Sequence, residues 1–180
     1  MAFGRPRKIW NQDALYEYAI GALGRRMRSV AELERLLRPR VLGNDRGGEL
    51  IEAVIARLKE QRYLNDSQYA AAYSTYRKEN EKFGRMRVIS ELKARGVHPE
   101  VIEKAVSSAY AGVDEEKLAR EHLRRKRLAK PANQKQAARI FRVLARAGFT
   151  TRTNIRILKK WEVDDEVLTA LESEQDQEKA

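Results

Sequence analysis

The chain has 180 residues, no cysteine, and 37 Lys and Arg against 26 Asp and Glu, which gives a formal net charge of +11. The lack of cysteine in the sequence excludes disulfides and thiol catalysis, and the two histidines, His98 and His122, have no partners at zinc-ligand spacing, so we expect no metal and no cofactor. No apolar run approaches the roughly 20 residues of a membrane span, and the N-terminal residues lack the apolar core of a signal peptide, so we expect a cytoplasmic protein with no membrane partner. The basic excess indicates a polyanionic partner, unless it only coats a solvated helical surface.

The first predicted repeat covers residues 13–64 and follows a basic segment, 1–12, that we interpret as a flexible arm. Asp13 is expected to cap its first helix. Residues 29–32 (Ser-Val-Ala-Glu) have the sequence of a capping box, in which serine and glutamate side chains each accept a free backbone N–H at the start of a second helix. A glycine-rich loop, 39–48, then precedes a third helix with a regular apolar stripe.

The same plan restarts in residues 65–112, where Asp66 is expected to cap a helix. One face of that helix carries three tyrosines at i, i+4 and i+7: Tyr69, Tyr73 and Tyr76. This spacing favours core packing over stacking on nucleic-acid bases. Gly84 marks a turn before a second helix that ends at Gly96, a left-handed position typical of glycine, and Pro99 opens a third helix.

A third repeat is predicted for residues 113–171. Residues 87–97 align with residues 139–149 at equal spacing, which indicates a tandem repeat. No stretch shows sustained alternation of apolar and polar residues, so the predicted fold is all-α, an elongated array of three tandem three-helix repeats with no sheet. Residues 172–180 are rich in Glu, Asp and Gln and are predicted to form a disordered acidic tail.

Motif residues at characteristic spacing run through the first two repeats. They are Ala19, Leu23, Arg26, Ser29, Glu32 and Leu33 in the first, and Leu64, Asn65, Asp66, Tyr69, Ala70, Tyr73, Arg77, Gly84, Arg87, Glu91, Leu92, Arg95, Gly96 and Val97 in the second. In this set the chain resembles the RecX family of RecA regulators, over roughly residues 14–161. Two positions depart from the family pattern: Lys82 replaces a frequent glycine, and Val143 stands in the third repeat where Glu91 stands in the second.

The resemblance implies a regulator without catalytic chemistry. RecX-like proteins are elongated arrays of three-helix repeats that bind RecA and its DNA filament and also bind DNA themselves. They suppress filament extension, ATP hydrolysis, strand exchange and the coprotease activity. The resemblance therefore implies a negative regulator of RecA in recombination, DNA repair and the SOS response, with RecA, the RecA–DNA filament and single- and double-stranded DNA as partners. We expect a monomer.

A long basic run independently favours nucleic-acid binding. Residues 117–160 contain fifteen Lys or Arg and one acidic residue, Glu121. The candidate contacts form stripes on three predicted helices: Lys117, Arg120, Arg124 and Arg127; then Arg139, Arg142 and Arg146; then Arg152, Arg156 and Lys159, with Lys160 beside them. Such stripes suit contacts to backbone phosphates, which position a protein without reading sequence. The alternative is a solvated face.

A smaller basic set lies in the second repeat and provides candidate RecA contacts: Arg77, Arg85, Arg87, Lys93 and Arg95. A structural role is the alternative, since Arg87 stands four residues before Glu91 and can form a helix ion pair worth about 0.3–0.5 kcal/mol. Arg26 and Glu32 are open to the same two interpretations.

Two other functions compete with RecA inhibition. The chain could be a general helical DNA- or RNA-binding protein without a RecA partner, or a protein-interaction array whose charge serves solubility. An enzyme is disfavoured, because the sequence offers no cysteine nucleophile, no evident histidine triad and no acidic cluster of metal-binding type.

Overall fold

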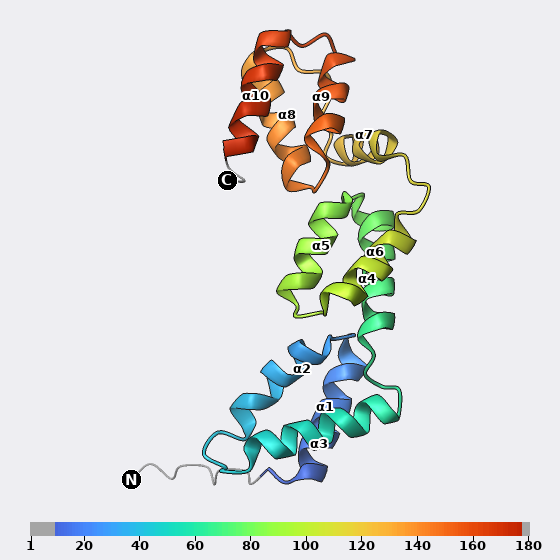
Figure 1. Ribbon diagram of the computed structural model, residues 1–180, viewed down its shortest axis with the longest axis vertical. Coiled ribbons are helices and arrows are strands. Elements are labelled where there is room, and N and C mark those ends of the chain that lie inside the picture. The colour runs from blue at the N-terminus through green and yellow to red at the C-terminus, as the bar shows by residue number, and fades with distance from the viewer. Residues whose placement is uncertain (1–9, 178–180) are drawn as a thin grey trace. The chain divides into compact units, whose positions relative to one another are not determined.

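The computed structural model describes residues 10–177, without the side chains of 174–177, and within this range it is all-helical with no strand. The predicted all-α fold class is therefore confirmed (Figure 1). None of the described helices combines the length and the apolar character that crossing a membrane requires.

The helices follow the predicted order and add two that were not predicted, the short 3-10 helix Arg38–Arg40 and the C-terminal helix Asp165–Gln177. Their bounds are α1 (Gln12–Arg25), α2 (Val30–Leu37), the 3-10 helix η1 (Arg38–Arg40), α3 (Gly47–Glu60), α4 (Asp66–Glu81), α5 (Arg85–Ala94), α6 (Pro99–Ala109), α7 (Glu115–Arg125), α8 (Gln134–Arg146), α9 (Thr151–Lys159) and α10 (Asp165–Gln177). They belong to two compact units: a first unit of Met1–Tyr69 with Arg95–His98, and a second unit of Ala70–Ala94 with Pro99–Ala180. Because residues of the predicted second repeat contribute to both units, the division into repeats at 64/65 stays a prediction.

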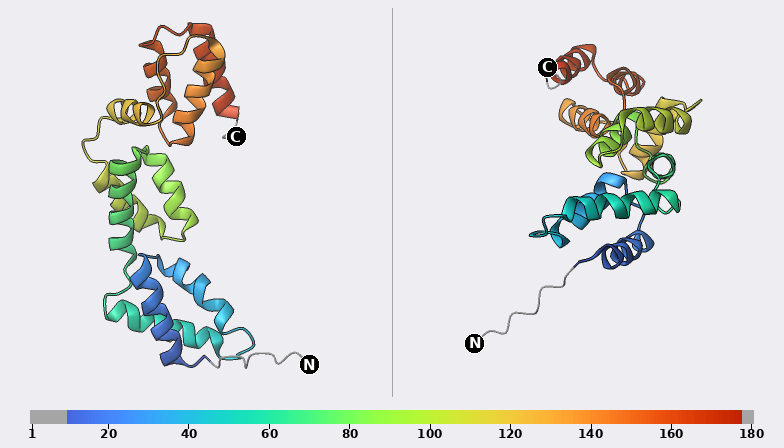
Figure 2. Two further views of the ribbon diagram at one scale, coloured as in Figure 1. Left: turned by 180° about the vertical axis from the view of Figure 1, so that it is seen from behind. Right: turned by 60° about the horizontal axis from the view of Figure 1, so that its bottom comes forward.

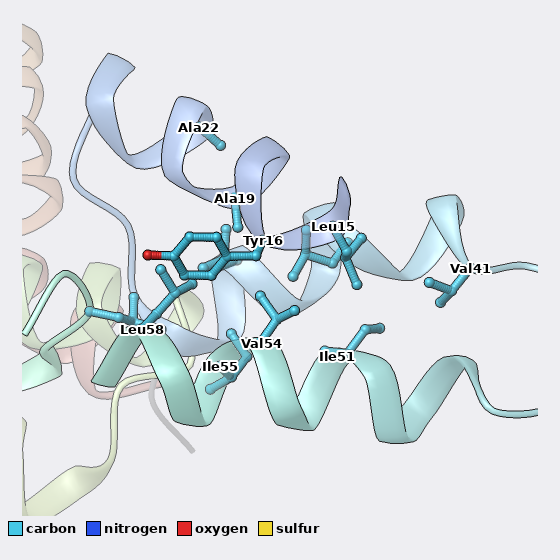
Figure 3. Packing of buried hydrophobic residues seen from close by; sticks show 12 residues of the cluster. Leu15, Tyr16, Ala19, Ala22, Val41, Ile51, Val54, Ile55 and Leu58 are labelled. Carbon is cyan, nitrogen blue, oxygen red and sulfur yellow. The ribbon is translucent and has the colours of Figure 1, made fainter. Parts of the chain in front are cut away.

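Helices α1, α2 and α3 share the core of the first unit. Figure 3 shows Tyr16 and Ala19 of α1 directed toward Val54 and Leu58 of α3. Several of these apolar side chains have no exposed surface. Each large one contributes about 1.5–3 kcal/mol relative to an exposed position, so this core supplies the main stabilisation of the unit.

The N-terminus of α1 differs from the sequence prediction. Asn11, not Asp13, caps the helix, since its side chain accepts a hydrogen bond from Ala14 N at 2.9 Å. Trp10 packs edge-on against Tyr18, with 5.6 Å between ring centroids. The flexible-arm prediction is therefore wrong for residues 10–12, while residues 1–9 lie outside the described part of the chain.

The start of α4 also corrects a predicted cap. Asn65 Oδ1 accepts from Gln68 N at 3.0 Å, whereas Asp66 lies in the first turn and accepts from Val30 N at 2.9 Å. Asp66 thus ties α4 to the start of α2 within the first unit. The capping box predicted for α2, Ser29 with Glu32, is confirmed.

The three tyrosines of α4 have different environments. Tyr69 is buried, and Tyr73 is half-buried with its hydroxyl donating to Glu91 at 2.8 Å. Tyr76 is 55% exposed. Core packing is therefore confirmed for Tyr69 and wrong for Tyr76, because i, i+7 spacing aligns residues on a helix but does not fix how far its partners extend.

A glycine turn packs against a helix start twice along the chain. In the first unit, Gly96 (φ +76°) lies against α2: a Cβ on Gly96 would come within 2.5 Å of Ala31 Cβ, and Ser29 Oγ donates to Arg95 O at 2.6 Å. The left-handed conformation and the missing side chain explain why glycine ends α5. The predicted left-handed position is therefore confirmed at Gly96.

The second unit repeats this contact at Gly148 (φ +86°), where a Cβ would overlap the backbone of Arg87. Gly84 N donates to Ala147 O at 2.8 Å and Met86 N to Gly148 O at 3.2 Å. The start of α5 therefore holds the turn after α8 as the start of α2 holds the turn after α5. Both contacts follow the predicted alignment of residues 87–97 with 139–149.

Helices α7, α8, α9 and α10 share the core of the second unit, and α8, α9 and α10 lie alongside one another (Figures 1 and 2). Leu168 and Leu171 of α10 are buried. The tail prediction is therefore wrong for residues 172–177, which continue this helix, and residues 178–180 lie outside the described part of the chain. Asp165 and Glu166 in the first turn complement the helix dipole. This helix-start signal was overlooked because the segment that follows is acidic and resembles a disordered tail.

Candidate nucleic-acid interface

Helix α8 separates its apolar and basic residues onto opposite faces. Ala137, Ile140, Phe141 and Leu144 are buried in the core. Arg139, Arg142 and Arg146 are all exposed, and their i, i+3, i+7 spacing places them on the opposite side of the helix. The predicted stripe on α8 is therefore present as an outward-facing row.

Helix α9 has the same division. Ile157 and Leu158 are fully buried, whereas Arg152 and Arg156, one turn apart, are exposed. Because α8 and α9 pack against each other around a shared core, their outward faces point in different directions. The basic residues of the third predicted repeat are thus distributed around the bundle and do not form one flat patch.

Several predicted nucleic-acid contacts are engaged in ion pairs instead. Glu116 accepts from Arg120 at 3.0 Å and from Lys160 at 2.6 Å. The hydrogen bond from Lys160, with help from Arg120, holds the pKa of Glu116 below its usual value. Lys159 pairs with Asp165 at 3.2 Å. These acids lie just outside the 117–160 window, so the count along the sequence overstated the free charge.

The acidic residue inside the window is paired as well. Glu121 contacts Lys82 at 3.0 Å, and that hydrogen bond lowers the pKa of Glu121, with smaller contributions from the charges of Lys117 and Arg124. Lys117 and Arg124 are exposed on α7, and Arg127 follows that helix in a left-handed conformation (φ +55°).

Seven exposed arginines of the third predicted repeat make no ion pair within the described residues: Arg124, Arg127, Arg139, Arg142, Arg146, Arg152 and Arg156. We refer to them as the unpaired arginines. Their guanidinium groups are available to phosphate oxygens, for which arginine offers two parallel donors.

The predicted RecA contacts have a different environment, centred on Glu91. Arg77 donates to both Glu91 oxygens, Nε to Oε2 and Nη2 to Oε1, each at 2.8 Å. Arg87 Nε and the Tyr73 hydroxyl also donate to this carboxylate at 2.8 Å. Burial opposes ionisation of Glu91, but the bonds from Arg87, Arg77 and Tyr73 outweigh it and lower its pKa. These four residues, the Glu91 network, join α4 to α5.

Two more of the predicted RecA contacts are paired. Arg95 contacts Glu32 at 2.6 Å, and Arg85 contacts Glu103 at 2.7 Å. Arg26 lies 3.7 Å from Glu32, so the structural interpretation of that pair is favoured too. Lys93 on α5 is exposed and has no ion pair among the described residues. Four of the five candidates are therefore engaged in ion pairs within the fold.

His122 is a buried polar residue whose role the sequence prediction missed. Its Nδ1 lies 3.1 Å from Glu81 O, and its ring packs near Phe83 and Phe149. Burial lowers the pKa of His122. The sequence did indicate that His122 is buried, because it falls on the same helical stripe as Leu118 and Ala119. The described residues contain no group of three acidic, histidine or cysteine side chains that could hold a metal ion.

Comparison with known proteins agrees with this architecture. Residues 65–106, which include the Glu91 network, match the family model for the second three-helix domain of RecX. The regulatory protein RecX of Mycolicibacterium vanbaalenii is 34% identical over 131 residues, 69% of this chain and 69% of that protein. The one from Myxococcus xanthus is 33% identical over 159 residues, 81% of this chain and 84% of that protein. The chain belongs to the RecX family.

A crystal structure of a regulatory protein RecX has the same fold as this RecX-family chain. The two superpose with a TM-score of 0.68 over 83% of this chain and 73% of that chain, at 17% sequence identity. The identities above confirm the resemblance to the RecX family, and this superposition confirms the predicted helical-repeat fold. The chain is a RecX-type regulator.

Proposed function

We propose that this protein is a negative regulator of RecA that binds RecA and its DNA filament. In this function it inhibits filament extension, ATP hydrolysis, strand exchange and coprotease activity, and so modulates recombination, DNA repair and the SOS response in the cytoplasm. The observation that carries the proposal is membership of the RecX family, supported by 33–34% identity to two regulatory RecX proteins over most of the chain. We further propose that the protein acts as a monomer.

The unpaired arginines support contact with the DNA of the filament. Each guanidinium that reaches a phosphate releases condensed counterions, which strengthens binding without any preference for sequence. This suits a regulator that must act on filaments formed on any DNA. The rows on α8 and α9 face different directions, so we propose that one face of a DNA strand contacts one row at a time.

Contact with RecA itself is proposed for the second predicted repeat. There, Lys93 is the exposed candidate, whereas Arg77, Arg87 and Arg95 act indirectly by fixing the helices that would carry the contact surface. The match of residues 65–106 to the RecX family model supports a role for this segment.

The decisive experiment measures the DNA-dependent ATPase of RecA after addition of this protein at sub-stoichiometric amounts. We expect inhibition, because a regulator that stops filament extension affects many RecA subunits per molecule bound. Unchanged ATPase activity at low salt would contradict the proposal. Bovine serum albumin at the same concentration controls for non-specific effects.

A general nucleic-acid-binding protein is the second candidate, and the unpaired arginines favour it specifically. It predicts DNA or RNA binding that weakens steeply with salt, together with no capture of RecA in a pull-down without DNA. Binding of RecA in that pull-down would exclude this candidate.

A further inference from the structure

Met86, the second residue of α5, has an exposed side chain on a fixed backbone. Its side chain is 54% exposed. Its N–H donates to Gly148 O, so the contact between the start of α5 and the turn after α8 holds the residue in place. An exposed methionine in a defined position is an adaptable apolar contact, of the kind found on protein-binding surfaces.

Two hollows of the second unit border Met86. The first is a pocket of about 250 Å³ with apolar walls from Tyr110, Val113 and Leu118. The second is a shallow groove of about 430 Å³ between α5 and the C-terminal end of α8. Four of the residues that line the groove are small: Ser90, Ala94, Ala145 and Gly148. Small side chains allow the backbone of a bound segment to come close.

The carboxylates in these hollows already have donors. Glu91, in the groove, is held by the Glu91 network, and Glu115, in the pocket, accepts from Thr150 N at 3.0 Å and Thr150 Oγ1 at 2.7 Å. Arg146, also in the groove, is exposed and is one of the unpaired arginines. The free charge at the edge of the groove is therefore positive.

We propose that Met86 and its two flanking hollows form the docking surface for a protein segment that carries an apolar side chain next to a carboxylate. The apolar side chain would enter beside Met86, and the carboxylate would pair with Arg146. This inference rests on the proposed function, because it assigns the surface to the protein partner. DNA fits less well: its phosphates could reach Arg146 at the edge of the groove, but further in they would approach the carboxylates of Glu91 and Glu115, whose donors are already engaged.

The test compares Met86→Glu with Met27→Glu in two assays, inhibition of the RecA ATPase and binding to naked single-stranded DNA. Met27 is a matched control, because it is 55% exposed and lines neither hollow. A glutamate in the first turn of α5 is compatible with the helix dipole, so Met86→Glu should fold, which thermal unfolding verifies. Ser90→Glu, at an exposed position of the groove, is the second variant.

We expect Met86→Glu to raise the concentration for half-inhibition by about tenfold or more, as for loss of a central apolar anchor. Ser90→Glu should act in the same direction. Naked-DNA binding should change much less for either variant, because only one of the seven unpaired arginines, Arg146, lines the groove. Met27→Glu should behave as wild type in both assays.

The outcomes separate this proposal from the proposed function. If wild-type protein inhibits RecA and Met86→Glu inhibits equally well, the docking surface alone is overturned. Equal losses in both assays would assign the surface to DNA and also overturn it. If wild-type protein does not inhibit RecA, both proposals fall together.

Discussion

Two aligned arginines show how the second and third predicted repeats differ. Arg87 on α5 and Arg139 on α8 occupy equivalent positions in the alignment of residues 87–97 with 139–149. Arg87 pairs with Glu91 four residues later at 2.8 Å. The residue four positions after Arg139 is Val143, and Arg139 is exposed with no ion pair among the described residues.

The difference teaches that a single acidic position decides what these arginines do. In α5, Glu91 gathers Tyr73, Arg77 and Arg87, so that the charges hold α4 and α5 together. In α8, without that acid, the helix is held by its apolar face and by hydrogen bonds to backbone carbonyls at its C-terminal end, and the arginines stay available to a ligand. The same repeat framework thus carries structural arginines in one place and candidate phosphate contacts in another.

The largest effect is expected from reversing the charge of four unpaired arginines, Arg139, Arg142, Arg152 and Arg156, to glutamate. DNA affinity at low salt should fall on the order of 100-fold. The slope of log affinity against log salt should drop by about 1.4, because each of the two arginines in the row that contacts single-stranded DNA contributes about 0.7. Fluorescence anisotropy with labelled single-stranded DNA at several salt concentrations measures both. Stability should change by only about 0.5 kcal/mol per exposed site.

The matched control reverses four exposed basic residues of the first unit: Arg25, Arg38, Lys59 and Arg62. It changes the net charge equally, so its effect on DNA binding isolates the general electrostatic contribution. If the control weakens binding as much as the α8 and α9 variant, the unpaired arginines have no special role.

The next largest effect is expected from removing the carboxylate at the centre of the Glu91 network. Glu91→Gln should lower the free energy of unfolding by about 1–3 kcal/mol, because it leaves the half-buried guanidinium of Arg77 and the exposed one of Arg87 without their carboxylate. DNA affinity should stay the same. Urea denaturation followed by circular dichroism provides the measurement, with the exposed Glu79→Gln on α4 as the control. A stability loss no larger than that of the control would remove the structural role of the Glu91 network.

The pH dependence of that stabilisation gives a smaller, graded effect. The pKa of Glu91 lies below its ordinary value of 4.5, so ionised Glu91 stabilises the folded state fully above pH 4.5. The stabilisation is lost as the pH falls through the lowered folded-state pKa. The difference in unfolding free energy between wild type and Glu91→Gln should therefore shrink below pH 4.5, and a difference that stays constant down to pH 3 would contradict this assignment.

The smallest effect comes from introducing the missing acid. Val143→Glu should pair with Arg139 as Glu91 pairs with Arg87, and it should weaken DNA binding about twofold, in line with the 0.3–0.5 kcal/mol of such a pair. Val143→Gln controls for loss of the half-buried valine. Equal affinities of the two variants would show that one acid at this position does not convert a free arginine into a paired one.

The sequence by itself determined most helix positions, because the signals that start and end a helix act over three or four residues. The capping box at Ser29 and Glu32 and the glycine end at Gly96 were recognisable for this reason. The alignment of the second and third repeats likewise depended only on residues close together in the sequence. It even identified the departure at Val143 that distinguishes their arginines.

The predictions of helix caps were wrong where a second residue that can cap a helix lay nearby. Asn11 and Asn65 cap helices for which Asp13 and Asp66 were predicted, two or one residues away. Helix α10 was missed because its acidic composition resembles a disordered tail, while its fold depends on Leu168 and Leu171 entering a core formed by α8 and α9. Burial of that kind is a property of the packed unit.

Only the tertiary structure decided which charges are free. Arg95 and Glu32 are 63 residues apart in sequence and 2.6 Å apart in space, and Lys160 reaches Glu116 across 44 residues. The composition gives the number of arginines in the third repeat correctly. An ion pair, however, requires that two opposite charges lie within a few ångströms of each other in space, and the sequence does not show this. The sequence therefore determined where the helices and the basic stripes lie, and the packing of those helices determined which arginines hold the fold and which remain for a partner.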